Sequence, residues 1–320
     1  MAVLFNATRL ATRSRIGLYS PTIRAVHSVG LVEFVRHELF HSDYYHMKFL
    51  TFLLNSTHCS FGLPWDMSIA ATALVLRSLV FSPFYIYAEK NYTKVLYIAI
   101  DCAKSRSQLH EKIKQTTSFQ KLSSRTADRY LESMSRHVFI KTCRANNCHP
   151  LKSFATTIVQ LPFWLSFTFC LRNICGISTS PNDVWTPLVP DLVTEGLNVA
   201  CAHWLLPMCL LLTGLANIEL MHLRTPRSNL WNFRLSRGAG WFGNLVIFYF
   251  SLFVPKAIVV YWTTSAIHQF ITHLLVMHPW MRERFGIRLR PTEGIHPYRV
   301  LLQTAIDRYA LLRWFRLKRL

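Results

Sequence analysis

Long apolar runs alternate with polar, basic stretches along this chain. A helix needs about 20 residues to cross the hydrocarbon layer of a membrane. Four runs reach that length: 67–87, 153–171, 204–222 and 239–277. The last is too long for one crossing, and we expect Pro255 and Lys256 to divide it, because proline interrupts a helix and lysine seeks the membrane surface. The pattern therefore predicts an all-α membrane protein with five transmembrane helices.

The polar segment 88–152 lies between the first two predicted spans and is patterned like helix rather than like irregular loop. Apolar residues recur at intervals of three and four from Tyr92 and again from Tyr130, with a run of Thr and Ser between them. This spacing predicts two antiparallel amphipathic helices that leave the membrane as a hairpin. Two interpretations stay open: a solvated pair without a partner, or a docking or gating element for a bound protein.

Residues 1–30 have the composition of a mitochondrial transit peptide. They contain four arginines, no acidic residue and many Ser, Thr and Ala, and they lack the uninterrupted apolar stretch of a secretory signal. A disordered basic tail is the alternative. Residues 31–66 follow, and apolar and polar positions alternate there, which predicts an amphipathic segment on a membrane surface.

The chain carries a net charge of +20, is 51% hydrophobic and only 16% charged. The cations are sorted: 27 of the 36 Lys and Arg lie in 88–152, 223–238 and 279–320, whereas 174–203 has none. A nucleic-acid-binding protein has no reason to alternate basic segments with apolar spans, whereas the positive-inside rule produces this sorting. The prediction is a five-span membrane core at 67–278 and a basic tail at 279–320. The hairpin and C-terminus face the mitochondrial matrix, and the N-terminus faces the intermembrane space.

Arg77 is the eleventh residue of the first predicted span and lies too deep to reach either surface easily. An arginine at mid-membrane costs roughly 2.5–3.5 kcal/mol, so it normally faces a partner or a wet cavity. That need is satisfied either by an ion pair or carbonyl contacts between helices, or by a polar groove inside the membrane. Gln160 and Asn217, in the second and third spans, are the further candidates for lining a groove, although polar residues in spans often bond their own backbone.

Five short motifs stand in the predicted membrane region in a fixed order. They are Leu76-Arg77-Ser78 with Pro83, Asn147-Cys148-His149-Pro150-Leu151, Gln160-Leu161-Pro162-Phe163-Trp164, Leu206-Pro207-Met208, and Val254-Pro255-Lys256 with Val260-Tyr261-Trp262. Each is weak alone, but together they resemble the YidC/Oxa/Alb membrane-insertase family. The resemblance covers about residues 60–280 and is strongest to the mitochondrial branch that assists cytochrome c oxidase assembly.

The resemblance implies a chain that inserts protein segments into the mitochondrial inner membrane through a hydrophilic groove lined by Arg77. It also implies that the chain exports the C-terminal tail of cytochrome c oxidase subunit 2. Its expected partners are subunit 2, other oxidase assembly factors and inner-membrane lipid. No bond chemistry, cofactor, metal or nucleic acid is expected. The tail after the fifth span resembles the short tail of the assembly branch rather than the long ribosome-binding tail of its better-known paralogue.

A membrane-bound zinc protease is the alternative. His37, Glu38 and His41 match the HExxH pattern, which on a helix presents two zinc ligands and a glutamate base. The pattern arises easily by chance in a chain with 14 histidines. A small-solute carrier fits less well, because no internal repeat is visible. A disulfide among Cys59, Cys175 and Cys201 is left open by the sequence.

Overall fold

The structure is a computed structural model that describes residues 44–114, 124–176, 195–225 and 230–309. Every regular element within these ranges is a helix, as the sequence predicts. The elements are α4 (Tyr45–Phe61), α5 (Trp65–Leu76), the π-turn η1 (Arg77–Phe81), α6 (Ser82–Lys114), α8 (Ser124–Ala145), the 3-10 turn η2 (Pro150–Phe154), α9 (Ala155–Ile174), α11 (Leu205–Arg224), α12 (Leu230–Ser251), α13 (Lys256–Met277), α14 (Pro279–Arg284) and α15 (Pro297–Arg308). The predicted transit peptide 1–30 and the HExxH residues His37, Glu38 and His41 lie outside the described ranges.

Helices occupy all five segments predicted as spans, but two of the described helices are apolar and long enough on composition alone to cross a membrane. These are Trp65–Ser105, within the continuous helix that starts at α5, and α11. The predicted break at Pro255 is present, with α12 ending at Ser251 and α13 beginning at Lys256. α12 begins at Leu230, well before the predicted start at residue 239. The count of five spans stays a prediction.

The first predicted span and the first arm of the hairpin form one unbroken helix, through α5, η1 and α6. Proline at position 83 has no backbone N–H and ordinarily interrupts a helix. Here the backbone N–H of Ser82 donates to the carbonyl of Arg77, five residues earlier, so a single π-turn precedes the proline. Such turns are frequent at functional sites, and this one begins at Arg77.

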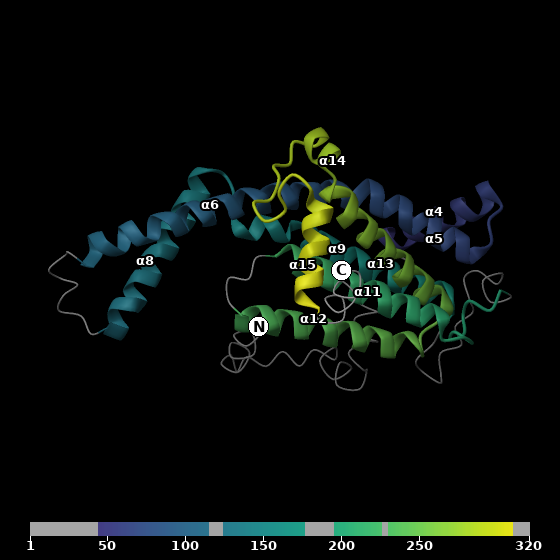
Figure 1. The fold of residues 1–320 in the computed structure, drawn as a ribbon. Coiled ribbons are helices and arrows are strands. Elements are labelled where there is room, and N and C mark those ends of the chain that lie inside the picture. Colours follow the sequence, from purple (N-terminus) through teal and green to yellow (C-terminus); the bar gives the residue numbers. More distant parts are fainter. Residues whose placement is uncertain (1–43, 115–123, 177–194, 226–229, 310–320) are drawn as a thin grey trace, which may run out of the picture.

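The hairpin of α6 and α8 projects beyond the other helices (Figure 1), and its two arms pack against each other near the bundle. Asn91 fixes the base of the hairpin, because its side-chain amide donates to the His149 carbonyl at 2.9 Å and to the Ser153 hydroxyl at 2.8 Å. His149 in turn accepts from the backbone N–H of Leu151 and caps η2. This gives the His149-Pro150 motif a structural role.

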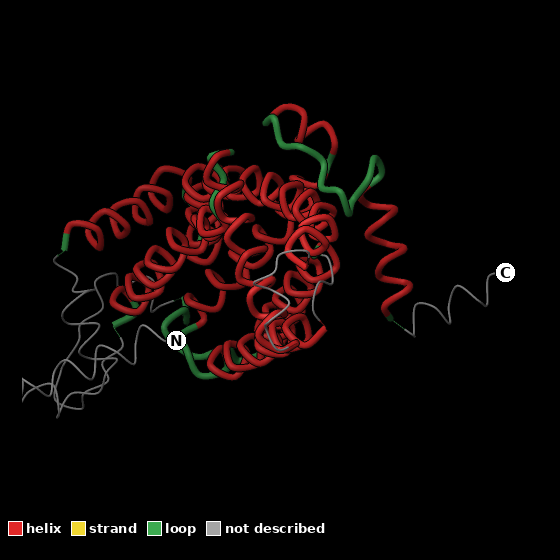
Figure 2. Tube along the Cα trace, turned by 90° about the vertical axis from the view of Figure 1, so that its left-hand side faces the viewer, coloured by secondary structure: helices red, strands yellow, loops and turns green. Residues whose placement is uncertain are grey.

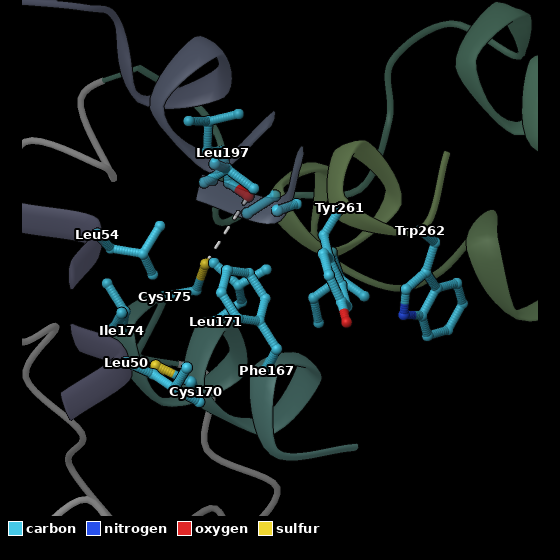
Figure 3. Close-up of a cluster of buried hydrophobic side chains, with 14 of the residues drawn as sticks. Leu50, Leu54, Phe167, Cys170, Leu171, Ile174, Cys175, Leu197, Tyr261 and Trp262 are labelled. Carbon is cyan, nitrogen blue, oxygen red and sulfur yellow. Dashed lines mark hydrogen bonds between the residues drawn. The ribbon is translucent and has the colours of Figure 1, made fainter. Parts of the chain in front are cut away.

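A buried apolar core closes the end of the bundle that carries α4 (Figure 3). Phe167 and Leu171 of α9 and Tyr261 of α13 are almost fully buried there, together with Leu50 and Leu54 of α4. α4 therefore buries one face against α5 and α9. Its other face is apolar too and exposed, through Tyr45, Phe49, Phe52 and Phe61. The amphipathic surface segment predicted for 31–66 stays a prediction.

The tail that follows α13 turns back beside the bundle over its described part, 279–309, and its last helix stands at the side of the other helices (Figure 2). The Tyr97 hydroxyl of α6 donates to the Leu289 carbonyl, and the Tyr298 hydroxyl of α15 donates to the Leu274 carbonyl of α13, both at 2.9 Å. Arg308 donates to the His222 carbonyl at the end of α11. The tail is thus part of the folded structure rather than a simple basic extension.

All eight cysteines lie in the described ranges and are free. The disulfide considered among Cys59, Cys175 and Cys201 is therefore not formed in this structure.

Candidate functional site

A cavity of about 580 Å³ lies between α9, α11, α12 and α13, with Arg77 in its wall. Gln160 of α9 and Asn217 of α11 also line it. The structure thus brings the three groove candidates chosen from the sequence to one cavity, although they come from three segments far apart in the chain. Asn244 of α12 and Gln269 of α13 add further amide groups to the lining.

Arg77 is 4% exposed and has no carboxylate partner among the described residues. Its guanidinium lies 5.8 Å from the centre of the Phe81 ring and interacts with the Tyr261 hydroxyl. Its Nε is buried without a hydrogen-bond partner. The interhelical ion pair considered for Arg77 is therefore absent from the described part of the chain. The positive charge of Arg77 lies in the cavity wall instead.

Asn217 is held by two backbone carbonyls, because its amide nitrogen donates to Thr213 at 3.0 Å and to Ala266 of α13 at 2.9 Å. Its side-chain oxygen is buried and has no donor. Gln160 lies in the same wall beside Thr157, one helical turn earlier on α9. The lining therefore offers both an uncompensated cation and unpaired polar atoms.

The opposite wall of the cavity is made by small residues of α12, namely Ala239, Gly240 and Gly243. Gly240 packs closely on α11, where a Cβ would lie 3.2 Å from the Ile218 side chain. A Cβ on Gly243 would meet nothing within 4 Å. The α12 backbone is thus fixed against α11 on one side and leaves open space on the cavity side at Gly243.

A second cavity of about 560 Å³ adjoins the first and shares Gln160, Asn217 and Gln269 with it. We call the cavity at Arg77 the first chamber and this one the second chamber. The second chamber extends toward Glu89 of α6 and Arg224 at the end of α11. The two chambers adjoin and run from the middle of the bundle toward the end where the tail is folded, and their mainly apolar walls carry a few polar groups.

A buried cluster of five charged residues, which we call the ion cluster, forms one end of the second chamber. Glu89 accepts hydrogen bonds from Arg224 at 3.0 Å, from Arg282 at 2.9 Å and from both Nε and Nη2 of Arg290 at 2.9 and 2.6 Å. Glu293 pairs with Arg224 at 2.7 Å and with Arg282 at 2.9 Å. Burial lowers the pKa of Arg282, whereas Glu293 and Glu89 raise it.

Sequence reasoning missed the ion cluster. The available signal was the presence of glutamates in strongly basic surroundings: Glu89 soon after the first span, and Glu293 in the tail. Pairing them required knowledge that the tail returns to α6. The three arginines outnumber the two glutamates, so the ion cluster retains one positive charge.

The outer faces of these helices are apolar and exposed. Ile158 of α9 is 67% exposed, Phe242 of α12 is 70% exposed and Ile271 of α13 is 48% exposed. Large apolar side chains that face outward from several helices, beside a buried core that is apolar as well, are unusual for a water-soluble protein. Such a bundle is that of a helical membrane protein.

Comparison with known proteins narrows the class of helical membrane protein to which this chain is similar. The chain is 25% identical over 250 residues to the mouse "Cytochrome c oxidase assembly protein COX18, mitochondrial". The aligned residues cover 75% of this chain and 73% of the mouse protein. The human protein of that name is 25% identical over 254 residues, 77% of this chain and 75% of its own length. The fission-yeast protein is 25% identical over 214 residues, 66% and 92% of the two chains. No protein-family model matches the chain.

These relatives confirm the resemblance to the oxidase-assembly branch that the five motifs predict.

Proposed function

We propose that this chain is a membrane protein insertase that serves cytochrome c oxidase assembly in the mitochondrial inner membrane. The single observation that carries the proposal is Arg77, a buried cation without an acidic partner among the described residues, in the wall of a cavity that also holds amide side chains. The names of the relatives support the biological role. The reaction needs no cofactor and breaks no bond, so we assign the chain no enzymatic activity.

The cavity lowers the barrier to translocation by shortening the apolar path. Each unpaired backbone or charged group costs several kcal/mol in hydrocarbon. A client segment that enters a polar cavity keeps partners for these groups while it crosses. In this proposal Arg77 attracts acidic or polar client groups transiently, and Gln160 and Asn217 supply hydrogen bonds.

All five helices cross the membrane in this proposal, although α9, α12 and α13 are not apolar enough by composition. Their composition has a structural cause: they carry the polar residues that line the chambers, such as Gln160, Asn244 and Gln269. Their outer faces are apolar and exposed, as described above. The sorting of cations then orients the ion cluster, the α6–α8 hairpin and the tail toward the matrix.

The proposed client is cytochrome c oxidase subunit 2, whose C-terminal tail is exported to the intermembrane space, with other oxidase assembly factors as partners. Moving one negative charge from the matrix to the positive side gains about 2.3 kcal/mol per 100 mV. We therefore expect acidic or weakly charged tails to be preferred. Equal export of a lysine-rich tail across energised and depolarised membranes would contradict this electrostatic account.

Replacement of Arg77 tests the proposal. Arg77→Ala and Arg77→Lys would be expressed in cells that lack the native protein, and protease protection of mitoplasts would follow the subunit 2 tail. We expect the tail to stay protected with alanine and to become accessible with lysine, because the cation is what the cavity needs. Normal export with both variants would leave Arg77 without a translocation role.

Filling the first chamber gives a second test with a matched control. Gly243→Leu places a side chain in open space in the chamber wall, and Gly238→Leu, on the same helix, also meets nothing within 4 Å but lies outside the lining. We expect Gly243→Leu to block export and Gly238→Leu to leave it unchanged, with equal amounts of both variants in the membrane. Equal export by the two would argue against the cavity as the path.

A further inference from the structure

The second chamber contains a buried histidine that the proposed function has not used. His273 of α13 is 4% exposed and lines the second chamber. The Gln269 side-chain nitrogen lies 2.7 Å from its Nε2, so Nε2 accepts and the neutral ring carries its proton on Nδ1. Nδ1 has no hydrogen-bond partner. His273 thus borders the second chamber and has one buried N–H donor without a partner among the described residues.

The surroundings of His273 favour an anion. Arg224 and Arg290 line the same chamber, and the ion cluster to which they belong retains one positive charge. Glu89 is the only carboxylate in the lining, and the arginines already engage it. Tyr85 packs on the His273 ring at 5.0 Å between centres and accepts from Arg224 at 3.4 Å, which fixes both groups. A donor beside excess positive charge is a binding arrangement for a carboxylate.

We propose that the second chamber is a receptor for an acidic side chain of the client, bound by His273 Nδ1–H and the ion cluster. This inference rests on the proposed function and adds to it a second contact, separate from Arg77. A peptide is favoured over a lipid headgroup because the second chamber shares Gln160, Asn217 and Gln269 with the first. One extended chain can therefore occupy both chambers.

The position of His273 makes this contact directional. Residues 269 and 273 are four apart on one helix, so they share a face and lie about 6 Å apart along its axis. A client segment that passes from the ion cluster to Arg77 meets His273 first and Gln269 second. The receptor then holds an acidic residue at the proposed matrix end while the chain ahead of it enters the first chamber.

The test compares His273→Phe with His268→Phe, since His268 is on the same helix, bonds Ser78 at 3.1 Å and lies outside both linings. Each variant would be assayed with a client tail carrying acidic residues and with the same tail carrying Asn and Gln instead. We expect His273→Phe to lower export of the acidic tail about tenfold, the scale of one hydrogen bond to a charged group, and to spare the neutral tail. The control variant His268→Phe should export the acidic and the neutral tail equally well.

His273→Asn keeps an N–H donor and should restore the preference for the acidic tail, which separates loss of the donor from misfolding. A photocrosslinker at Met221, in the chamber lining, should capture the arrested client, and one at Leu275, which is 50% exposed and outside the lining, should not. This inference is wrong if His273→Phe lowers export of both tails equally, or if the crosslinker at Met221 captures phospholipid rather than client. If Gly243→Leu also exports normally, the proposed function fails with it.

Discussion

Replacing Glu89 with glutamine removes the carboxylate that three buried arginines share. Glu89 accepts four hydrogen bonds, two from Arg290 and one each from Arg224 and Arg282, and the side chains of all four residues are between 1% and 8% exposed. Glutamine has nearly the same shape, so the change acts on charge and hydrogen bonding. Glu293 would then face three arginines alone.

Breaking a buried ion pair by removing one partner costs about 3–5 kcal/mol, because the remaining charge is uncompensated. Arg282 and Arg290 belong to the tail, so the cost falls on its docking to α6 and α11. At about 1.4 kcal/mol for each tenfold change, the equilibrium between docked and released tail would shift at least about a hundredfold.

Hydrogen–deuterium exchange of the purified protein in detergent measures that shift. The Ile287 amide donates to the Arg282 carbonyl at 2.7 Å within the tail, and the Ile287 side chain is buried, so its protection reports whether this segment of the tail stays folded. Glu283→Gln is the matched control, because Glu283 lies in the same segment and is exposed. A peptide over 285–293 should lose at least a hundredfold of protection in Glu89→Gln and almost none in the control. Protection within threefold of the control would refute the assigned role of the ion cluster.

Three further predictions concern packing and cysteine chemistry. Gly214→Ala should destabilise the protein by about 1–3 kcal/mol, because its Cβ would overlap Asn244 of α12. Gly238→Ala, in open space, should instead raise stability by about 0.5–1 kcal/mol. Thermal unfolding in detergent compares the two variants, and equal melting temperatures would contradict the close packing at Gly214. Trp262→Phe removes the indole donor 3.0 Å from the Thr168 hydroxyl and should cost about 1 kcal/mol in the same assay, with no loss expected if that bond is immaterial. Burial and the neighbouring Cys148 raise the pKa of Cys143 to about 11 from 9.0, so its thiolate fraction at pH 8 falls roughly a hundredfold. Maleimide should therefore label exposed Cys59 far faster than Cys143, and comparable rates would argue against burial in the hairpin.

Much of the fold was predictable, because helix length and the break at Pro255 depend on local sequence. The position of Arg77 at a cavity was also predictable, since an arginine in the middle of an apolar run needs polar surroundings. Gln160 and Asn217 could be ranked only as polar residues in spans. Their meeting at one cavity depends on how α9 and α11 rotate about their axes, and apolar periodicity is weak in helices that are apolar on several sides.

The ion cluster and His273 were not predictable by the same reasoning. Glu89, Arg224 and Glu293 lie in three segments separated by more than sixty residues each. Their pairing depends on the tertiary structure, whereas a count of charges along the sequence treats each basic segment as exposed to solvent. The helix start at Leu230 was missed for a related reason, because Arg234 and Arg237 looked like loop residues. Arg237 instead pairs with Glu219 of α11 at 2.7 Å.

The unbroken helix from Trp65 to Lys114 is also a mechanical element. Its 12, 5 and 33 residues in α5, η1 and α6 amount to a rod about 75 Å long, with Arg77 near one end and the hairpin tip at the other. A force applied to the tip acts with a long lever arm on the chamber wall. The π-turn at Arg77 interrupts the regular α-helical hydrogen-bond pattern of that rod. A displacement of the hairpin end would therefore be carried along one continuous helix to a residue that lines the cavity.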